Sequence, residues 1–262
     1  MSDVSQAIRV ALLTADPRAK VMAARAVARD WRLGRLPFGF ADAMPARPAW
    51  PAGLALLHPG QMPKRGRGGS ERNRLALWHA IAHIEFVAID LALDMAGRFG
   101  AAMGEAFTGD FLSVAADEAM HFALIERKLR ALGSHYGALP VHDGLWEAAH
   151  ATRHDVAARL AVVPMVLEAR GLDVTPGIIV RVRAQGDAHG AAILERILDD
   201  EICHVRIGAS HFAKTCQARG EDPNKHWKML VARHFRSRLK PPFNDSARVA
   251  AGLSRDQYAA LA

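Results

Sequence analysis

The pattern Asp-Glu-x-x-His occurs twice in this chain, as Asp117-Glu118-Ala119-Met120-His121 and as Asp200-Glu201-Ile202-Cys203-His204. The two copies lie 83 residues apart, since 204 − 121 = 83. Residues three apart on an α-helix lie on nearly the same face, so the Glu and the His of each copy can reach one metal ion. The pattern therefore predicts two helices that each direct a carboxylate and an imidazole at a metal.

A further glutamate precedes each copy at the same distance. Glu85 comes 33 residues before Glu118, and Glu168 comes 33 residues before Glu201. The chain thus contains an internal repeat with a period of 83 residues, and each repeat predicts one pair of ligand-bearing helices.

The repeat also contains turn signals and a second acidic position. The midpoints of the two glutamate pairs fall at Gly100-Ala101, beside Gly97, and at Ala184-Gln185, beside Gly186. An antiparallel hairpin turning at these points would bring its glutamates level. Asp90 and Asp173 follow the leading glutamates by five residues, and we expect them to cap helices or to pair with arginines such as Arg170.

Together the repeats supply four carboxylates and two imidazoles. The predicted metal ligands are Glu85, Glu118, His121, Glu168, Glu201 and His204. This hard donor set suits iron or manganese better than a structural zinc, which prefers Cys and His. We therefore predict two bound metal ions, two irons first, with manganese or a mixed pair as alternatives. The two motif glutamates would bridge the metals, and the two leading glutamates would be terminal ligands.

Three other residues are expected to support these ligands. Asp117 and Asp200 are the nearest candidates to accept a hydrogen bond from the second ring nitrogen of each histidine, across helices. His83 lies two residues before Glu85 and so points to a different face of its helix. We expect His83 to support the site or to form hydrogen bonds in the core rather than to ligate metal.

A third Glu-x-x-His, from Glu147 to His150, has Val114 where the leading glutamate should be, so we exclude it. The six chosen residues could instead be exposed helix charges, but apolar neighbours argue against this. Residues 84–88 around Glu85 and residues 164–167 before Glu168 are apolar, and a bare carboxylate buried there would be costly unless paired or metal-bound. Pro164 should kink its helix, either to shape the metal site or as an ordinary bend.

The rest of the chain predicts an all-α protein. Ala, Leu, Arg and Glu favour helix, and no stretch alternates with period two. The expected helices cover residues 4–14, 17–33, 70–97, 104–132, 145–170 and 187–219, with a short helix starting at Thr175-Pro176. We expect three parts: N-terminal helices with a proline-rich arm (1–70), a four-helix bundle (71–220), and a basic tail packed on it (221–262).

Composition and apolar runs indicate where the protein is located and which partners it can bind. The longest uninterrupted apolar run, Leu160 to Leu167, contains Pro164 and is too short to cross a bilayer. The N-terminal residues lack a secretory pattern, and Cys203 and Cys216 give no disulfide framework, so the cytoplasm is expected. A net charge of +7 admits RNA or a phosphorylated metabolite as a partner, but excess charge alone is weak evidence, and we do not favour nucleic-acid binding.

Three segments resemble a bacterial ferritin-like family of unknown function. They are Trp78 to Glu85, Leu167 to Asp173 and Asp199 to His204, and the resemblance covers roughly residues 10–245. It implies a ferritin-like bundle holding two metals, with one Glu from each of two helices and Glu-x-x-His from each of the others. The repeated motif is more distantly similar to bacterial multicomponent monooxygenases and to the tRNA hydroxylase of that superfamily, which favours oxygen chemistry by analogy.

Three functions stay open at this point. The first is a non-haem di-iron oxidoreductase that activates dioxygen, acts on a small or RNA-borne substrate and takes electrons from an external donor. The second is an iron-oxidising or metal-handling protein without an organic substrate. The third is a dimanganese protein that disproportionates peroxide or uses its metals structurally. The sequence leaves the oligomeric state open, and a dimer is one option.

Overall fold

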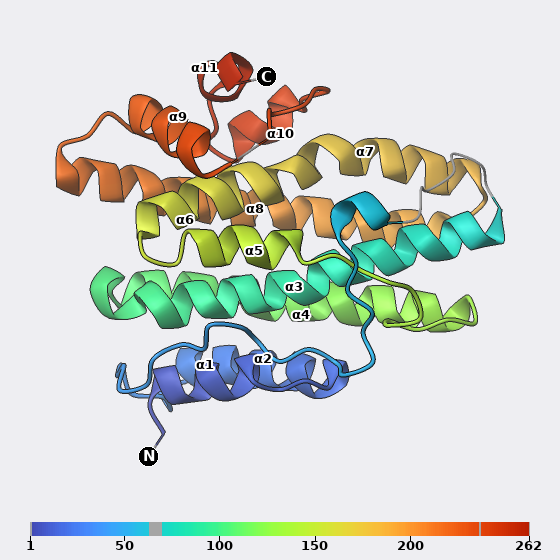
Figure 1. Ribbon diagram of the computed structural model, residues 1–262, viewed down its shortest axis with the longest axis horizontal. Coiled ribbons are helices and arrows are strands. Elements are labelled where there is room, and N and C mark those ends of the chain that lie inside the picture. Colours follow the sequence, from blue (N-terminus) through green and yellow to red (C-terminus); the bar gives the residue numbers. More distant parts are fainter. Residues whose placement is uncertain (1, 63–69, 236, 262) are drawn as a thin grey trace. The chain divides into compact units, whose positions relative to one another are not determined.

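The computed structural model describes residues 2–62, 70–235 and 237–261 and confirms an all-α protein (Figure 1). No strand occurs among these residues, and their one parallel β-bridge joins Leu56 to Val141. Lys64, Arg65, Arg67 and Arg236, which belong to the basic segments of the sequence, lie outside the described residues.

The chain divides into two compact units, residues 1–146 and 147–262. The first contains α1 (Val4–Leu12), α2 (Pro17–Arg32), the 3-10 turn η1 (Pro59–Gln61), α3 (Glu71–Met103) and α4 (Glu105–Ala131). The second contains α6 (Val156–Val162), the π-helix η2 (Val163–Glu168), α7 (Ala169–Ala184), α8 (Ala188–Arg219), α9 (Pro223–His234), α10 (Asp245–Ala250), α11 (Arg255–Tyr258) and η3 (Ala259–Leu261). Helix α5 (Gly144–Ala151) crosses the boundary. The boundaries expected near residues 70 and 220 stay predictions.

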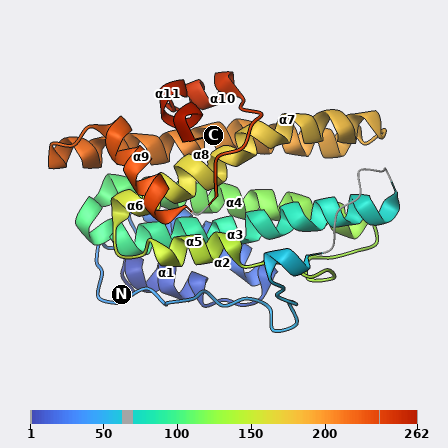
Figure 2. The ribbon, with the colours of Figure 1, turned by 45° about the horizontal axis from the view of Figure 1, so that its top comes forward.

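In the first unit, α3 and α4 form an antiparallel hairpin, and α1 and α2 lie along it (Figures 1 and 2). Ser70 caps the start of α3 by accepting from the Asn73 amide, and Gly104 ends α3 with a positive φ of 89° that favours glycine. The turn therefore lies at Gly104, slightly beyond the expected Gly100-Ala101. Gly97 and Gly100 instead provide notches against which Met44 and Phe40 of the proline-rich arm pack.

Helix α3 is long and apolar enough to cross a membrane, with a mean hydropathy of 1.5 over its most apolar window. However, 72% of that window is buried in the structure. Asp90 and Asp94 lie inside this helix, fully buried, and each forms an ion pair. These features are typical of the core helix of a soluble protein.

In the second unit, the single helix expected over residues 145–170 is wrong. The chain leaves the helix after Ala151, and Asp155 caps a new helix by accepting from the Ala157 amide. The helix then continues through η2 and past Gly171 to Ala184, so Pro176 lies inside α7 and does not start a short helix.

A side chain from the C-terminal part explains why α7 tolerates this proline. Pro176 has no N–H, so the carbonyl of Leu172, four residues earlier, lacks its usual helical donor. Asn244 Nδ2 donates to that carbonyl at 3.1 Å. The hydrogen bond lost within the helix is thus replaced from outside it.

Candidate metal centre

In the first unit, α3 and α4 bring Glu85, Glu118 and His121 together. The Nδ1 atom of His121 lies 3.3 Å from Glu85 Oε2 and 3.3 Å from Glu118 Oε2. All three side chains are buried, with 5%, 1% and 0% of their surfaces exposed. Their ligand atoms lie within 4.8 Å of one another, so this triad could hold a metal ion.

The electrostatics of the triad suit a cation. Burial opposes a charge on His121, but the hydrogen bonds and charges of Glu118 and Glu85 outweigh it and raise the imidazole pKa to about 11. Two carboxylates and one imidazolium leave a net negative charge inside the protein. Because oxygen and imidazole donors are those preferred by iron and manganese, the residues present fit such an ion. It would displace the proton from His121.

In the second unit, the structure brings Glu201 and His204 together on α8. His204 Nδ1 lies 3.7 Å from Glu201 Oε1, and the His204 side chain is 2% exposed. The predicted partner Glu168 is half-buried and lies at the last position of η2, a segment that packs against α8.

A close contact sets the register between η2 and α8. Gly208 lies directly against Pro164, so that a Cβ at position 208 would overlap the Pro164 ring. Pro164 lies four residues before Glu168, and Gly208 four residues after His204. The two segments are antiparallel, so this contact brings Glu168 level with His204. Pro164 lies in a π-helix, Val163–Glu168, that ends at the predicted ligand Glu168, and π-helices are frequent at functional sites. Whether it shapes a metal site or is an ordinary bend stays a prediction.

The repeat extends to the aspartates that follow the leading glutamates. Asp90 forms a fully buried ion pair with Lys20 of α2, and Asp173 forms a buried ion pair with Arg248 of α10. Burial raises the pKa of Asp90 to about 6 and lowers the pKa of Lys20. Arg170, the expected partner of Asp173, also approaches it, at 3.5 Å.

Both ring nitrogens of His83 form hydrogen bonds on another face of α3. Its Nε2 lies 2.9 Å from the carbonyl oxygen of His142, which can only accept, so Nε2 donates. Nδ1 is then the acceptor for the hydroxyl of Tyr136, at 2.9 Å. Burial lowers the pKa of His83 to about 4, consistent with this neutral form.

His79 holds the same loop. Its Nε2 accepts from the backbone amides of Gly137 and Leu139, and its ring stacks on Tyr136. His79 and His83 therefore attach the loop between α4 and α5 to α3, and His83 has the core hydrogen-bonding role that was one of its expected roles.

Other expectations near the ligands have mixed outcomes. The side chain of Asp200 accepts from Arg196 at 2.7 Å on its own helix, and the roles of Asp117 and Asp200 toward the histidines stay predictions. Cys203 is exposed. Ile84, one of the apolar neighbours expected to surround Glu85, is 49% exposed, so Ile84 does not account for the burial of Glu85.

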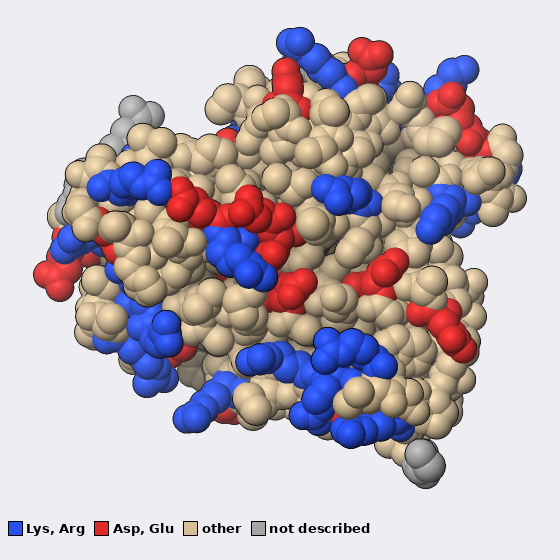
Figure 3. Space-filling model, turned by 180° about the vertical axis from the view of Figure 1, so that it is seen from behind, with Lys and Arg blue, Asp and Glu red and all other residues tan. Residues whose placement is uncertain are grey.

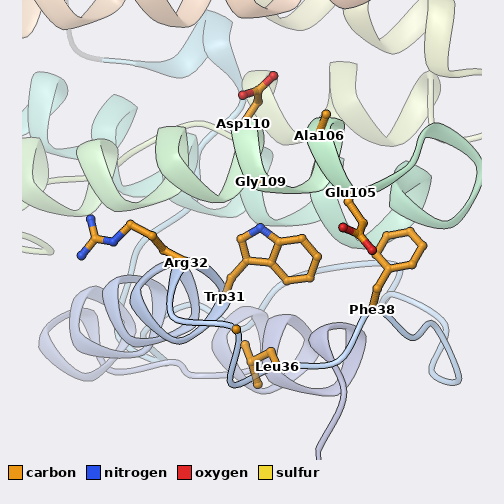
Figure 4. Close-up of a pocket in the computed structure, with 9 residues that line it drawn as sticks. Trp31, Arg32, Leu36, Phe38, Glu105, Ala106, Gly109 and Asp110 are labelled. Carbon is orange, nitrogen blue, oxygen red and sulfur yellow. The ribbon is translucent and has the colours of Figure 1, made fainter.

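The first unit has a cavity of about 540 Å³ whose lining includes none of the six predicted ligands (Figure 4). Trp31 and Phe38 line it beside Arg32, opposite Glu105 and Asp110 at the start of α4. Exposed arginines lie along α2, namely Arg18, Arg25, Arg29 and Arg32. Side chains of both signs are spread over the face shown in Figure 3. In the cavity, the carboxylate of Glu105, which points toward Phe38 in Figure 4, opposes an anionic ligand.

Sequence reasoning missed Lys20, Arg248 and Tyr136, which contact the helices that carry predicted ligands. The repeated aspartates gave a usable signal for the two cations, because a carboxylate at a core position of a helix requires a partner. For Tyr136, the two histidines one turn apart on α3 were the available signal.

Comparisons with known proteins find a family and a relative, neither of which has a described function. A family described as a protein of unknown function matches residues 13–259. An uncharacterised protein of Haemophilus influenzae is 42% identical over 215 residues, which cover 80% of this chain and 74% of that protein. No solved structure gives a significant match.

Proposed function

This chain belongs to the DUF455 family of proteins of unknown function, and we propose that it is a ferritin-like dinuclear metalloprotein that oxidises a substrate with dioxygen. The buried triad of Glu85, Glu118 and His121 is the observation that carries the proposal. Two glutamates buried against one imidazole are costly unless a cation compensates their charge.

The second half of the site follows from the repeat. Glu168, Glu201 and His204 stand 83 residues after Glu85, Glu118 and His121. We propose that the two sets of ligands would together hold two metal ions, with Glu118 and Glu201 as the ligands that both ions would share. Four carboxylates and two imidazoles can neutralise two divalent ions, and two irons are the first choice on donor chemistry.

The protein residues have distinct tasks in this proposal. His121 gives up its proton when metal binds and then ligates through a ring nitrogen. The apolar side chains of α3 and α4 limit access of water to the triad, and Phe86 and Phe122, directly after Glu85 and His121, are almost fully buried. When bound, a pair of irons supplies redox chemistry with dioxygen that side chains alone lack.

The wider setting of the reaction is part of the same proposal. No electron-transfer group is evident among the described residues, so the electrons come from an external donor. The substrate is a small molecule or a group carried on RNA, and the reaction takes place in the cytoplasm.

Metal analysis tests this function directly. The protein would be purified without chelator, and its metals counted by plasma mass spectrometry, beside a Glu118→Ala/His121→Ala variant. The matched control is Glu147→Ala/His150→Ala, which removes the Glu-x-x-His motif outside the predicted site. We expect about two irons per chain, lost in the first variant and kept in the second.

Other results would redirect or overturn the proposal. Two manganese ions per chain would keep the site but favour peroxide chemistry, and iron taken up with oxygen but released as mineral would favour metal handling. If neither iron nor manganese binds after anaerobic reconstitution, the dinuclear site is wrong. With iron bound, oxygen consumption that rises with a candidate substrate would support the oxidase.

A further inference from the structure

We propose that Lys20 and Arg248 are positioning residues that hold the two leading glutamates, Glu85 and Glu168, in register for metal binding. Each cation forms an ion pair, within its own unit, with the aspartate five residues after the glutamate. This inference rests on the proposed metal site but concerns side chains that do not touch metal.

In the first unit, two side chains bind Asp90 of α3. Lys20 of α2 forms an ion pair with Asp90 Oδ1, and its ammonium also donates to the carbonyl of Leu12 at 3.2 Å. Trp50 of the proline-rich arm donates from Nε1 to Asp90 Oδ2 at 2.9 Å. Both carboxylate oxygens of Asp90 are therefore held, from two segments outside the α3–α4 hairpin.

In the second unit, Arg248 binds the corresponding aspartate of α7, Asp173. Arg248 of α10 binds Asp173 with two hydrogen bonds, Nε to Oδ1 at 2.8 Å and Nη2 to Oδ2 at 2.6 Å. The backbone amide of Asn244 donates to Asp173 Oδ1 at 3.0 Å. Arg248 Nη2 also lies 3.5 Å from the carbonyl of Ala169, directly after Glu168.

The aspartates are placed where their ion pairs can restrict rotation of each helix about its own axis. Five residues correspond to roughly 140° around a helix, so each aspartate faces nearly away from the glutamate that it supports. A rotation of about 20° would move a carboxylate some 5 Å from the helix axis by about 2 Å. Metal–ligand distances tolerate only about 0.2 Å, so a helix that carries a ligand must not rotate.

The positions of Lys20 and Arg248 in the sequence support a functional role for the two ion pairs. The aspartates obey the 83-residue repeat, since 173 − 90 = 83, but the cations do not, since 248 − 20 = 228. One cation precedes the repeated region and is a lysine, and the other follows it and is an arginine. The repeat thus preserves the carboxylate, and each unit satisfies it with a different element.

A pair of double variants tests the role. Lys20→Met/Asp90→Asn removes both charges, which avoids leaving one buried charge alone. The matched control is Asp94→Asn/Arg98→Met, which removes another ion pair of α3 that reaches the arm through the carbonyl of Pro45. Circular dichroism would verify folding, and titration of the full chain with Co²⁺, followed by its visible absorption, would measure affinity and coordination.

We expect Lys20→Met/Asp90→Asn to bind Co²⁺ roughly 10-fold or more weaker than the wild type, as for other groups that orient metal ligands. Its absorption bands should also shift, whereas the control keeps both properties. Equal affinity and spectra in the two variants would overturn the inference. Failure of the wild type itself to bind Co²⁺, Fe²⁺ or Mn²⁺ would instead overturn the proposed function, so the two failures are distinguishable.

A charge-conserving variant keeps the test decisive if the double variant does not fold. Asp90→Glu retains the ion pair but lengthens the carboxylate, which should displace α3 and shift the Co²⁺ bands. Asp94→Glu is its control and should leave them in place. The equivalent variant in the second unit is Arg248→Met/Asp173→Asn, with the same expected loss; unchanged bands in both Asp90→Glu and this variant would contradict a positioning role.

Discussion

Gly208 lies so close to Pro164 that no larger residue fits at position 208 without moving the π-helix η2. Pro164 is one turn before Glu168, and Gly208 is one turn after His204. The distance between η2 and α8 at this contact therefore affects the positions of the predicted ligands Glu168 and His204. The proline ring cannot rotate away, so any change at position 208 must be absorbed by the backbone.

Gly208→Ala should therefore destabilise the protein by about 1–3 kcal/mol, the usual cost of overpacking a well-packed contact. Chemical denaturation followed by circular dichroism would measure the free energy of unfolding. Gly177→Ala is the control, because it lies in α7 with nothing within 4 Å of the added Cβ. That control should be neutral or stabilising by up to about 1 kcal/mol, and a loss as large as that of Gly208→Ala would contradict the steric explanation.

Tyr136→Phe should destabilise the first unit. It removes the hydroxyl that donates to His83 and leaves a buried imidazole nitrogen without this donor, which costs about 1–2 kcal/mol. Tyr258, the other tyrosine of the chain, donates to Asp245, whose side chain is 49% exposed. Tyr258→Phe should cost less than about 1 kcal/mol because water can replace the hydroxyl. The order of the two free energies of unfolding is the test.

Acidification should weaken the fold through the buried histidines of α3. Burial lowers the pKa of both His79 and His83 to about 4, below the value near 6.5 of an unfolded chain. Between these values the unfolded state binds more protons, so stability falls as the pH decreases from about 6.5 to 4. His83→Gln should flatten this part of the profile of unfolding free energy against pH. An unchanged slope would exclude His83 as its source.

Metal uptake at neutral pH should release a proton from the first triad. The carboxylates of Glu118 and Glu85 raise the pKa of His121 to about 11 in the absence of metal, so the imidazole is protonated until a metal displaces the proton. Affinity should then rise by about tenfold per pH unit for each proton displaced. Calorimetry in buffers of different ionisation enthalpy would count the protons. His121→Asn should release one proton fewer than the wild type, and equal release would assign the proton elsewhere.

The helical class and the buried cluster of Glu85, Glu118 and His121 could be predicted because both depend on local spacing. Glu-x-x-His encodes a helix face within one turn, and the structure brings Glu85, predicted from the repeat alone, to Glu118 and His121. The turn of the first hairpin was expected at Gly100-Ala101, beside Gly97, but lies at Gly104, since glycines that provide packing notches look like turn glycines in a sequence.

The second unit was harder to predict because its stabilising contacts are distant in sequence. Local rules end a helix before Pro176, and nothing near Pro176 indicates that Asn244 replaces the lost donor. The partners of Lys20 and Arg248 lie 70 and 75 residues away. Hydrophobic periodicity carries no information about such pairs, since it reports which face of a helix is buried and not what meets it.

The unequal origins of the two cations also bear on the history of the chain. If the 83-residue repeat records a duplication, residues inherited from the shorter ancestor must recur in both copies, and Asp90 and Asp173 do. Lys20 and Arg248 have no counterparts at that spacing: position 103 holds Met and position 165 holds Met. On that reading, the carboxylate is the inherited feature, and each copy now balances its charge with a cation from its own flanking sequence.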